Sequence, residues 1–202
     1  MLRAKNFKIV KNWRQRKIAG QVRDGIFPKG VSKEEIWKAL SATKKKNVAE
    51  MFGFLSAIAH NADGTLKKDY GLISIKEVTT NFAVRLVDAL MTSGDIIDNF
   101  NQHKMGAGST AETSADSRLA DVFQVGAQGA TGNAAATHGA TSNIYRTIGT
   151  LTAGSAYGCR EHGVFNASTG GIMLDRSTVT NIDLNTDDVV TWTYELTVNA
   201  GG

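Results

Sequence analysis

The sequence contains very little cysteine and proline: its 202 residues include only Cys159 and Pro28 of these types. A lone cysteine excludes an intramolecular disulfide, so we expect a fold that needs no oxidising compartment. The chain also lacks an apolar run of the roughly 20 residues that span a membrane. No apolar segment of signal-peptide type follows the basic first residues. These absences predict a soluble chain that contacts no membrane and is used without secretion.

Metal and cofactor ligands are equally sparse. A structural zinc site of the usual kind needs more thiolates than one cysteine supplies. The glycine-rich stretch from Gly106 to Ser109 has no lysine placed as in a phosphate-binding loop, and we expect a hinge or a surface loop there. The histidines show no ligand spacing; they are His60, His103, His138 and His162. The sequence therefore predicts no metal and no cofactor.

The most polar cluster of the C-terminal half combines Glu161 and His162 with Asp175 and Arg176. In an enzyme, His162 would be a general base that Glu161 orients. Neighbouring strand residues point to opposite faces, so these two side chains cannot serve one site without a bulge. We expect a structural cluster instead, with His162 or Asp175 bonded to a turn and Arg176 paired with an acid. No catalytic residue is predicted, and the protein is expected not to be an enzyme.

Charge is divided unevenly along the chain, whose net charge is +4. Residues 1–50 hold 14 Lys or Arg against 4 acids, a net +10, and residues 51–202 hold 9 against 15, a net −6. Residues 1–31 show no helical or strand period, so we expect an extended basic arm that lies on an acidic partner. The residues predicted to make this contact are Lys5, Phe7, Lys8, Lys11, Trp13, Arg14, Arg16 and Lys17.

Two or three helices are expected after the arm. Ser32 and Glu35 have the spacing of a capping box, in which each side chain satisfies a free amide at a helix start. An apolar stripe of three- and four-residue steps predicts a helix over 46–60. Several possible N-caps between Thr79 and Asn81 predict another helix, which is expected to end near Ser93 and Gly94, and a short strand is expected at 72–75.

Beyond residue 100 the chain reads as strands separated by glycine-rich turns. The predicted strands cover residues 143–151, 156–165, 171–179 and 188–198. The fold class is therefore α+β. Its parts are a basic extended N-terminal arm (1–31), a mainly helical segment (32–100) and a C-terminal antiparallel β-sandwich or small barrel (101–202).

The last predicted strand has one apolar and one polar face, because side chains two apart on a strand share a face. Trp192 and Tyr194 alternate there with Thr191 and Thr193. We expect the apolar face to lie in the core or in a subunit interface. The residues predicted for that role are Tyr145, Ile148, Phe165, Leu174, Trp192, Tyr194 and Leu196.

Four segments carry a further signal: residues 143–152 (NIYRTIGTLT), 161–166 (EHGVFN), 170–177 (GGIMLDRS) and the final strand VVTWTYELTV. Together they resemble a widespread family of structural proteins of tailed bacteriophages. The resemblance covers about residues 80–202, and the first 75 residues lie outside it.

The resemblance implies a virion component, present in the host cytoplasm before assembly and in the phage particle afterwards. A capsid decoration or cement protein is favoured, because the basic arm suits a head lattice that is often acidic outside. The implied partners are the major capsid protein and further copies of this chain, with a trimer as the expected assembly. A tail or head-fibre component is the first alternative, although no repeat, trimeric coiled coil or carbohydrate pocket is evident in the sequence. The second alternative is a nucleic-acid-binding protein that uses the arm on phosphates, and the net −6 of the remaining chain argues against it.

Overall fold

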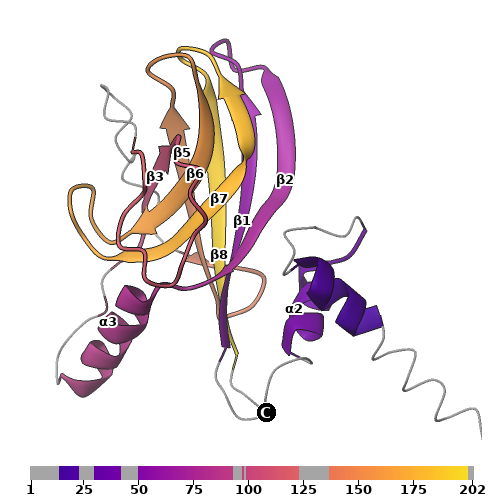
Figure 1. Cartoon of the computed structure of the whole chain (residues 1–202), viewed down its shortest axis with the longest axis vertical. Coiled ribbons are helices and arrows are strands. Elements are labelled where there is room, and N and C mark those ends of the chain that lie inside the picture. The colour runs from indigo at the N-terminus through magenta and orange to yellow at the C-terminus, as the bar shows by residue number, and fades with distance from the viewer. Residues whose placement is uncertain are drawn as a thin grey trace, which may run out of the picture. The chain divides into compact units, whose positions relative to one another are not determined.

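Figure 1 shows the computed structural model of the chain, which describes residues 14–22, 30–41, 50–92, 97, 99–122 and 137–199. The chain divides into two compact units, one of residues 1–50 with 199–202 and one of residues 51–198. In chain order the elements are α2 (Lys33–Ser41), β1 (Glu50–His60), β2 (Leu66–Glu77), α3 (Thr80–Met91), β3 (Gln102–Gly106), β4 (Thr137–His138), β5 (Ile144–Thr152), β6 (Tyr157–Phe165), β7 (Met173–Leu184) and β8 (Val189–Asn199).

The predicted capping box is confirmed at the start of α2. The Glu35 amide donates to Ser32 Oγ at 3.2 Å, and the Ser32 amide donates to Glu35 Oε2 at 3.3 Å. Two amides that the helix itself leaves without acceptors are thereby satisfied.

The expected extended arm is wrong over residues 14–22, which are helical. Ile18 and Val22 lie one helical turn apart and are both buried. Burial of one face therefore stabilises this helix, although the interspersed cations hide its apolar period in the sequence. The rest of the predicted arm, residues 1–13 and 23–29, lies outside the described residues, and so do its contact residues before Arg14.

The helix predicted over 46–60 is also wrong, because β1 begins at Glu50. Phe54 and Leu55 are adjacent and both buried, so the strand is covered on its two faces. Such a strand reads as a continuous apolar run, which a periodicity argument cannot separate from a helix. β1 pairs antiparallel with β2, which contains the strand predicted at 72–75 and is longer than expected.

The described strands form two sheets, with the orders β2-β1-β8-β5-β4 and β3-β6-β7. The pairs β1–β2, β3–β6, β4–β5, β5–β8 and β6–β7 are antiparallel. The strands predicted between residues 143 and 198 are confirmed as β5 to β8, and β7 continues as far as Leu184. The fold thus mixes a few helices with mostly antiparallel sheets, in agreement with the predicted class at that level.

One hydrophobic cluster draws on both sheets, and β8 contributes its inner face. Trp192 and Tyr194 are fully buried, whereas Thr191 and Thr193 are half-buried. The predicted alternation of β8 is therefore confirmed. It places the largest side chains in the cluster to which both sheets contribute and the threonines on the other side of β8.

α3 lies beyond one end of the strands (Figure 1) and begins where expected. Thr79 is its N-cap, and its Oγ1 accepts a hydrogen bond from the Phe82 amide at 3.2 Å. Phe82 packs edge-on against Phe100, with ring centroids 5.1 Å apart. Among the described residues, no helix has the length and apolar character to cross a membrane.

Candidate functional site

The polar cluster around Glu161 and His162 is divided between the two faces of the β3-β6-β7 sheet. Glu161 accepts hydrogen bonds from the segment of residues 107–122, whereas His162 contacts His103 and Trp192. Strand alternation separates the two side chains, as expected for adjacent positions. Consequently they do not converge on one point.

The Glu161 carboxylate is fully buried and surrounded by donors. It accepts the backbone amides of Gly108 at 3.1 Å, Ala120 at 2.9 Å and Asp121 at 2.7 Å. Arg176 adds Nε at 2.9 Å and Nη2 at 2.8 Å. Burial raises the pKa of Glu161, but the amides and Arg176 outweigh it and hold the pKa below its ordinary value. The carboxylate is therefore an ionised anchor for the backbone around it.

Arg176 confirms the expected pairing with an acid and extends the network. Its Nη1 donates to Asp116 Oδ2 at 2.9 Å, and its Nη2 donates to the Thr110 carbonyl at 3.1 Å. Burial lowers the pKa of Arg176, but its bonds to Asp116 and Glu161 outweigh this and raise the pKa above its ordinary value. The guanidinium thus joins β7 to two points of the overlying segment.

A second acid, Glu112, also holds the segment of residues 107–122 in place. Glu112 forms an ion pair with Lys76 of β2 and accepts the hydroxyl of Thr178 of β7. Burial raises the pKa of Glu112, but these two contacts outweigh it and lower the pKa. Residues 107–122 are consequently held by charged groups of β2, β6 and β7.

The centre of the core contains two imidazoles that are far apart in sequence. His103 Nδ1 lies 2.9 Å from His162 Nε2, and His103 Nε2 lies 3.3 Å from Thr147 Oγ1. The His162 ring stacks on Trp192 at a centroid distance of 4.5 Å. A Cβ added at Gly149 would lie 2.4 Å from His103 Cγ, so the glycine makes room for that ring. The antiparallel register of β3 and β6 creates this pair, and no spacing in the sequence signals it.

Burial controls the ionisation of both histidines. It lowers the pKa of His103 to about 3. The pKa of His162 is lowered well below its ordinary value by burial and by the neighbouring His103. Both rings are therefore neutral at pH 7, and the hydrogen bond between them uses a donor on one ring and an acceptor on the other.

Asp175 lies in the core too, and the expected bond of His162 or Asp175 to a turn is wrong. The Asp175 carboxyl accepts the hydroxyl of Ser177, two residues along β7, at 2.9 Å. Its second oxygen, Tyr194 OH and His162 Nδ1 are buried and make no hydrogen bond. Burial raises the pKa of Asp175 to about 7, with the Ser177 bond opposing the shift. The interior therefore holds a partly protonated carboxyl group beside neutral rings.

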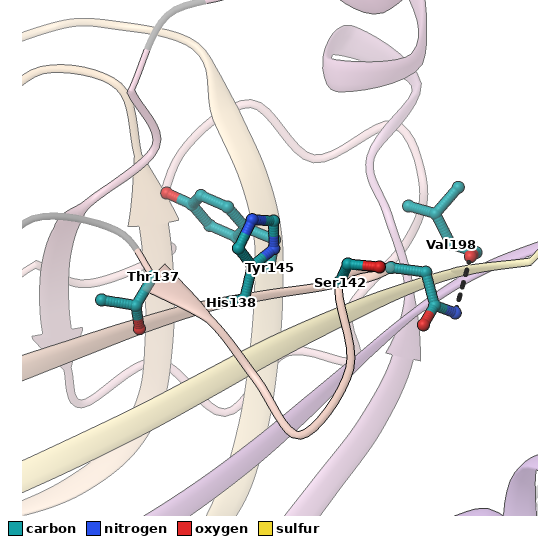
Figure 2. Close-up of a pocket in the computed structure, with 6 residues that line it drawn as sticks. Thr137, His138, Ser142, Tyr145 and Val198 are labelled. Atoms are coloured by element: carbon teal, nitrogen blue, oxygen red, sulfur yellow. Dashed lines mark hydrogen bonds between the residues drawn. The ribbon is translucent and has the colours of Figure 1, made fainter.

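A groove lies on the surface where the β4–β5 hairpin meets the end of β8 (Figure 2). Its volume is about 460 Å³, which falls within the range of roughly 300–1,000 Å³ typical of small-molecule sites. The lining residues are Thr137, His138, Ser142, Asn143, Tyr145 and Val198. The sequence indicates a core position for Tyr145 and shows His138 as an isolated histidine, and none of its patterns predicts that the two are neighbours.

α3 exposes several large apolar side chains. The exposed fractions are 54% for Val84, 52% for Val87, 80% for Leu90 and 79% for Met91. Phe82 is the buried residue of this helix. Sequence analysis predicted the helix but assigned no role to this surface.

The described part of the predicted arm contact consists of Arg14, Arg16 and Lys17, which are all exposed. Arg14 Nη2 lies 3.4 Å from Glu35 Oε1, an ion pair between two exposed side chains. Such a pair contributes little to stability, and the Arg14 side chain is 67% exposed.

The residues predicted for a core or subunit face divide into three groups. Leu174, Trp192, Tyr194 and Leu196 belong to the shared core, and Tyr145 packs against it. Phe165 is buried in a separate cluster with Leu119 and Met173. Ile148 is 44% exposed, so it does not lie in the core, and its alternative place in a subunit interface stays a prediction. It pairs with Thr193 on the polar side of β8, because it is an odd number of positions from Tyr145.

Within the described part of the chain, no three His, Cys, Asp or Glu side chains are grouped to hold a metal ion. Cys159 is a free, buried cysteine, as expected of a small core residue. No protein-family model, no curated protein and no solved structure matches this chain.

Proposed function

We propose that this chain is a non-enzymatic structural protein of a tailed-bacteriophage virion, a decoration protein that binds the outer surface of the head lattice. The observation that supports it best is the exposed apolar surface of α3, because large patches of this kind mark protein–protein contacts. The phage assignment itself rests on the sequence resemblance of residues 80–202.

The apolar surface of α3 is continuous and uncharged. Successive residues of an α-helix are rotated by about 100° around its axis. Five apolar residues of α3 therefore lie within an arc of about 120° around the helix, and the centre of that arc points away from Phe82; they are Ala83, Val84, Val87, Leu90 and Met91. A surface helix normally carries polar side chains on its outer side. Here the first charged neighbour, Asp88, lies outside the arc. A partner that covers α3 must therefore present an apolar surface of its own.

This surface needs a second contact to give stable binding. Full burial of Leu90 or Met91 contributes roughly 1.5–3 kcal/mol each. One helix side with four exposed apolar side chains is smaller than the roughly 800 Å² per partner of a standard interface. We assign the second contact to the basic N-terminal segment, where the helix of residues 14–22 exposes Arg14, Arg16 and Lys17, which would meet acidic groups on the shell.

The two sheets and the trimer belong to the same proposal. A β-sandwich built on the shared core would be a rigid body that holds α3 in a fixed orientation. Three copies on a three-fold axis of the lattice would convert three weak contacts into strong binding through their high effective concentration. The partners would then be the major capsid protein and the other two copies.

The alternatives use the same surfaces at other places. A tail or head-fibre component would dock α3 on a neighbouring virion protein. A nucleic-acid-binding protein would use the net +10 of residues 1–50 on phosphates. Imaging of the particle separates the first from a decoration protein, because a position at the tail tip is incompatible with binding to the head lattice.

The direct experiment is cosedimentation of the protein with DNA-free phage heads. The double variant Leu90→Ser/Met91→Ser should bind at least about tenfold more weakly, because it removes most of the exposed apolar surface of α3. Leu66→Ser is the matched control, since Leu66 is 61% exposed on β2. Wild-type occupancy with the α3 variant would refute the docking role of α3.

The contact made by the helix of residues 14–22 is tested by reversing its charges. Arg14→Glu/Arg16→Glu/Lys17→Glu should bind heads weakly, and added salt should affect this variant less than wild type. The reason is that the Debye length falls from about 10 Å at 0.1 M to about 3 Å at 1 M. Binding of full-length protein to naked duplex with a steep salt dependence, without binding to heads, would favour the nucleic-acid alternative.

A further inference from the structure

The groove between β4, β5 and β8 is held in shape by the turn that precedes β5. The Val198 amide donates to the Asn143 carbonyl at 3.1 Å, and Asn143 Nδ2 donates to the Val198 carbonyl at 3.1 Å. The Gly139 amide donates to the Ile144 carbonyl at 2.8 Å. A Cβ at Gly139 would lie 2.5 Å from Ile144 Cγ2, so the turn is tightly packed. A ligand would therefore meet a groove that already exists.

Two rings form the apolar part of this groove. His138 and Tyr145 are directly opposite each other in the β4–β5 pair, so their side chains share one face of the sheet and lie next to each other. Tyr145 OH donates to the Phe100 carbonyl at 2.7 Å, which leaves the face of the ring as an apolar surface. Val198 is 44% exposed and extends this surface. Figure 2 shows these side chains around the groove.

The polar part of the groove is neutral. Thr137 and Ser142 are exposed and carry hydroxyl groups that can donate and accept. Among the lining residues that the structure describes, none is Lys, Arg, Asp or Glu. Of the charged residues nearby, Arg146 and Glu195 pair with each other at 2.6 Å. His138 is thus the ionisable side chain of the described lining, which otherwise offers no group to compensate a formal charge on a ligand.

We infer that this groove binds a neutral saccharide. A sugar ring offers an apolar C–H face for the Tyr145 and Val198 surface, and hydroxyl groups for His138, which shares the face of Tyr145, and for Ser142. Few polar groups beside an aromatic surface are the usual composition of a small-molecule site. A phosphorylated or acidic ligand would lose its hydration without gaining a cation. This binding function is separate from attachment to a head lattice, and neither depends on the other.

The test is saturation-transfer difference NMR with the full chain and four free sugars: glucose, galactose, mannose and N-acetylglucosamine. At least one of them should receive magnetisation at its ring C–H protons, with a dissociation constant of about 1 mM. His138→Ala should weaken this binding about tenfold, and Val198→Trp, which fills the groove, should abolish it. His60→Ala is the matched control, because it removes a histidine at the end of β1, and it should bind as wild type does.

Three results would overturn the inference. One is the absence of transfer to all four sugars at concentrations of about 50 mM, far above the expected dissociation constant. Another is equal transfer to wild type, His138→Ala and Val198→Trp, which would mean binding elsewhere. The third is preferred binding of glucose 6-phosphate over glucose, which would show that the site selects a charge.

Discussion

Acid should destabilise the native chain through the buried pair of His103 and His162. Both imidazoles are fully buried, and their bonds to each other and to Thr147 involve no acid. A proton added to either ring would place an unpaired charge in the core. Burial accordingly lowers the pKa of His103 from 6.5 to about 3 and that of His162 in the same direction.

The sign of the effect follows from proton linkage. Above the ordinary histidine pKa of 6.5, neither the folded nor the unfolded state binds a proton at these rings. Below it, the unfolded state gains protons and the folded state does not, so stability falls as the pH falls toward the folded pKa of about 3. At about pH 4.5 the loss from His103 alone is about 3 kcal/mol, and His162 adds to it. Such a loss is a large part of the roughly 5–15 kcal/mol that stabilises a typical domain.

The assay is urea denaturation followed by circular dichroism at about pH 7.5 and about pH 4.5. Wild type is compared with His103→Gln/His162→Phe, in which the phenyl ring can still stack on Trp192. Asp175 and the other carboxyl groups titrate in both proteins, so their effects cancel in the difference. The free energy of unfolding of wild type minus that of the variant should be lower at about pH 4.5 than at about pH 7.5, by at least about 3 kcal/mol. A difference that is independent of pH would refute the neutral buried pair.

Three further outcomes follow from the core and its charged network. Trp192→Ala should lower the free energy of unfolding by about 3–5 kcal/mol, and Thr193→Ala should lower it by less than about 0.5 kcal/mol. Equal melting temperatures of the two variants would contradict the assignment of Trp192 to the inner face of β8 and of Thr193 to the outer face. Glu161→Gln should cost about 3–5 kcal/mol, because it leaves the buried arginine without its nearest carboxylate. It should also speed tryptic cleavage at the exposed Arg118, and an unchanged cleavage rate would argue against the anchoring role. Asp175 has a folded pKa of about 7 against 3.8, so wild type should lose up to about 4 kcal/mol as the pH rises through that window. Asp175→Asn should remove this loss, and identical profiles for the two proteins would exclude the buried carboxyl as its source.

The strands of the C-terminal half could be predicted because their signals are local. Alternation defines β8, and glycines mark the turn before β7, where Gly170 and Gly171 have φ values of 64° and 82°. Most residue types avoid such values, so the glycines are a physical signal of the turn. β1 could not be predicted in the same way, because its two covered faces remove the alternation. Burial on both sides depends on tertiary packing, which a local pattern does not contain.

The candidate sites were less accessible to prediction, because they depend on strand register. His103 and His162 are 59 positions apart and meet only through the pairing of β3 with β6. The groove needs the two-residue strand β4, whose residues carry no strand signal. The apolar surface of α3, unlike the histidine pair and the groove, has a signal in the sequence. Val84 and Val87 accompany Phe82 there, in a predicted helix that is apolar on most sides. That pattern is itself a signal of a covered surface, although it does not say which side meets the core.

The glycine-rich stretch at the end of β3 shows how a local reading can miss a packing role. Gly106 and Gly108 suggested a hinge or a surface loop, but both are buried, and Gly106 belongs to β3. A Cβ at either position would lie within 2.6 Å of Glu161 Oε1. The glycines therefore allow the backbone to approach the carboxylate closely enough for the Gly108 amide to donate to it. An ionised, fully bonded carboxylate then holds a segment that has few apolar anchors of its own. The charged groups of this cluster thus hold a segment in place beneath the surface, and we propose that α3, the groove and the exposed cations recognise partners.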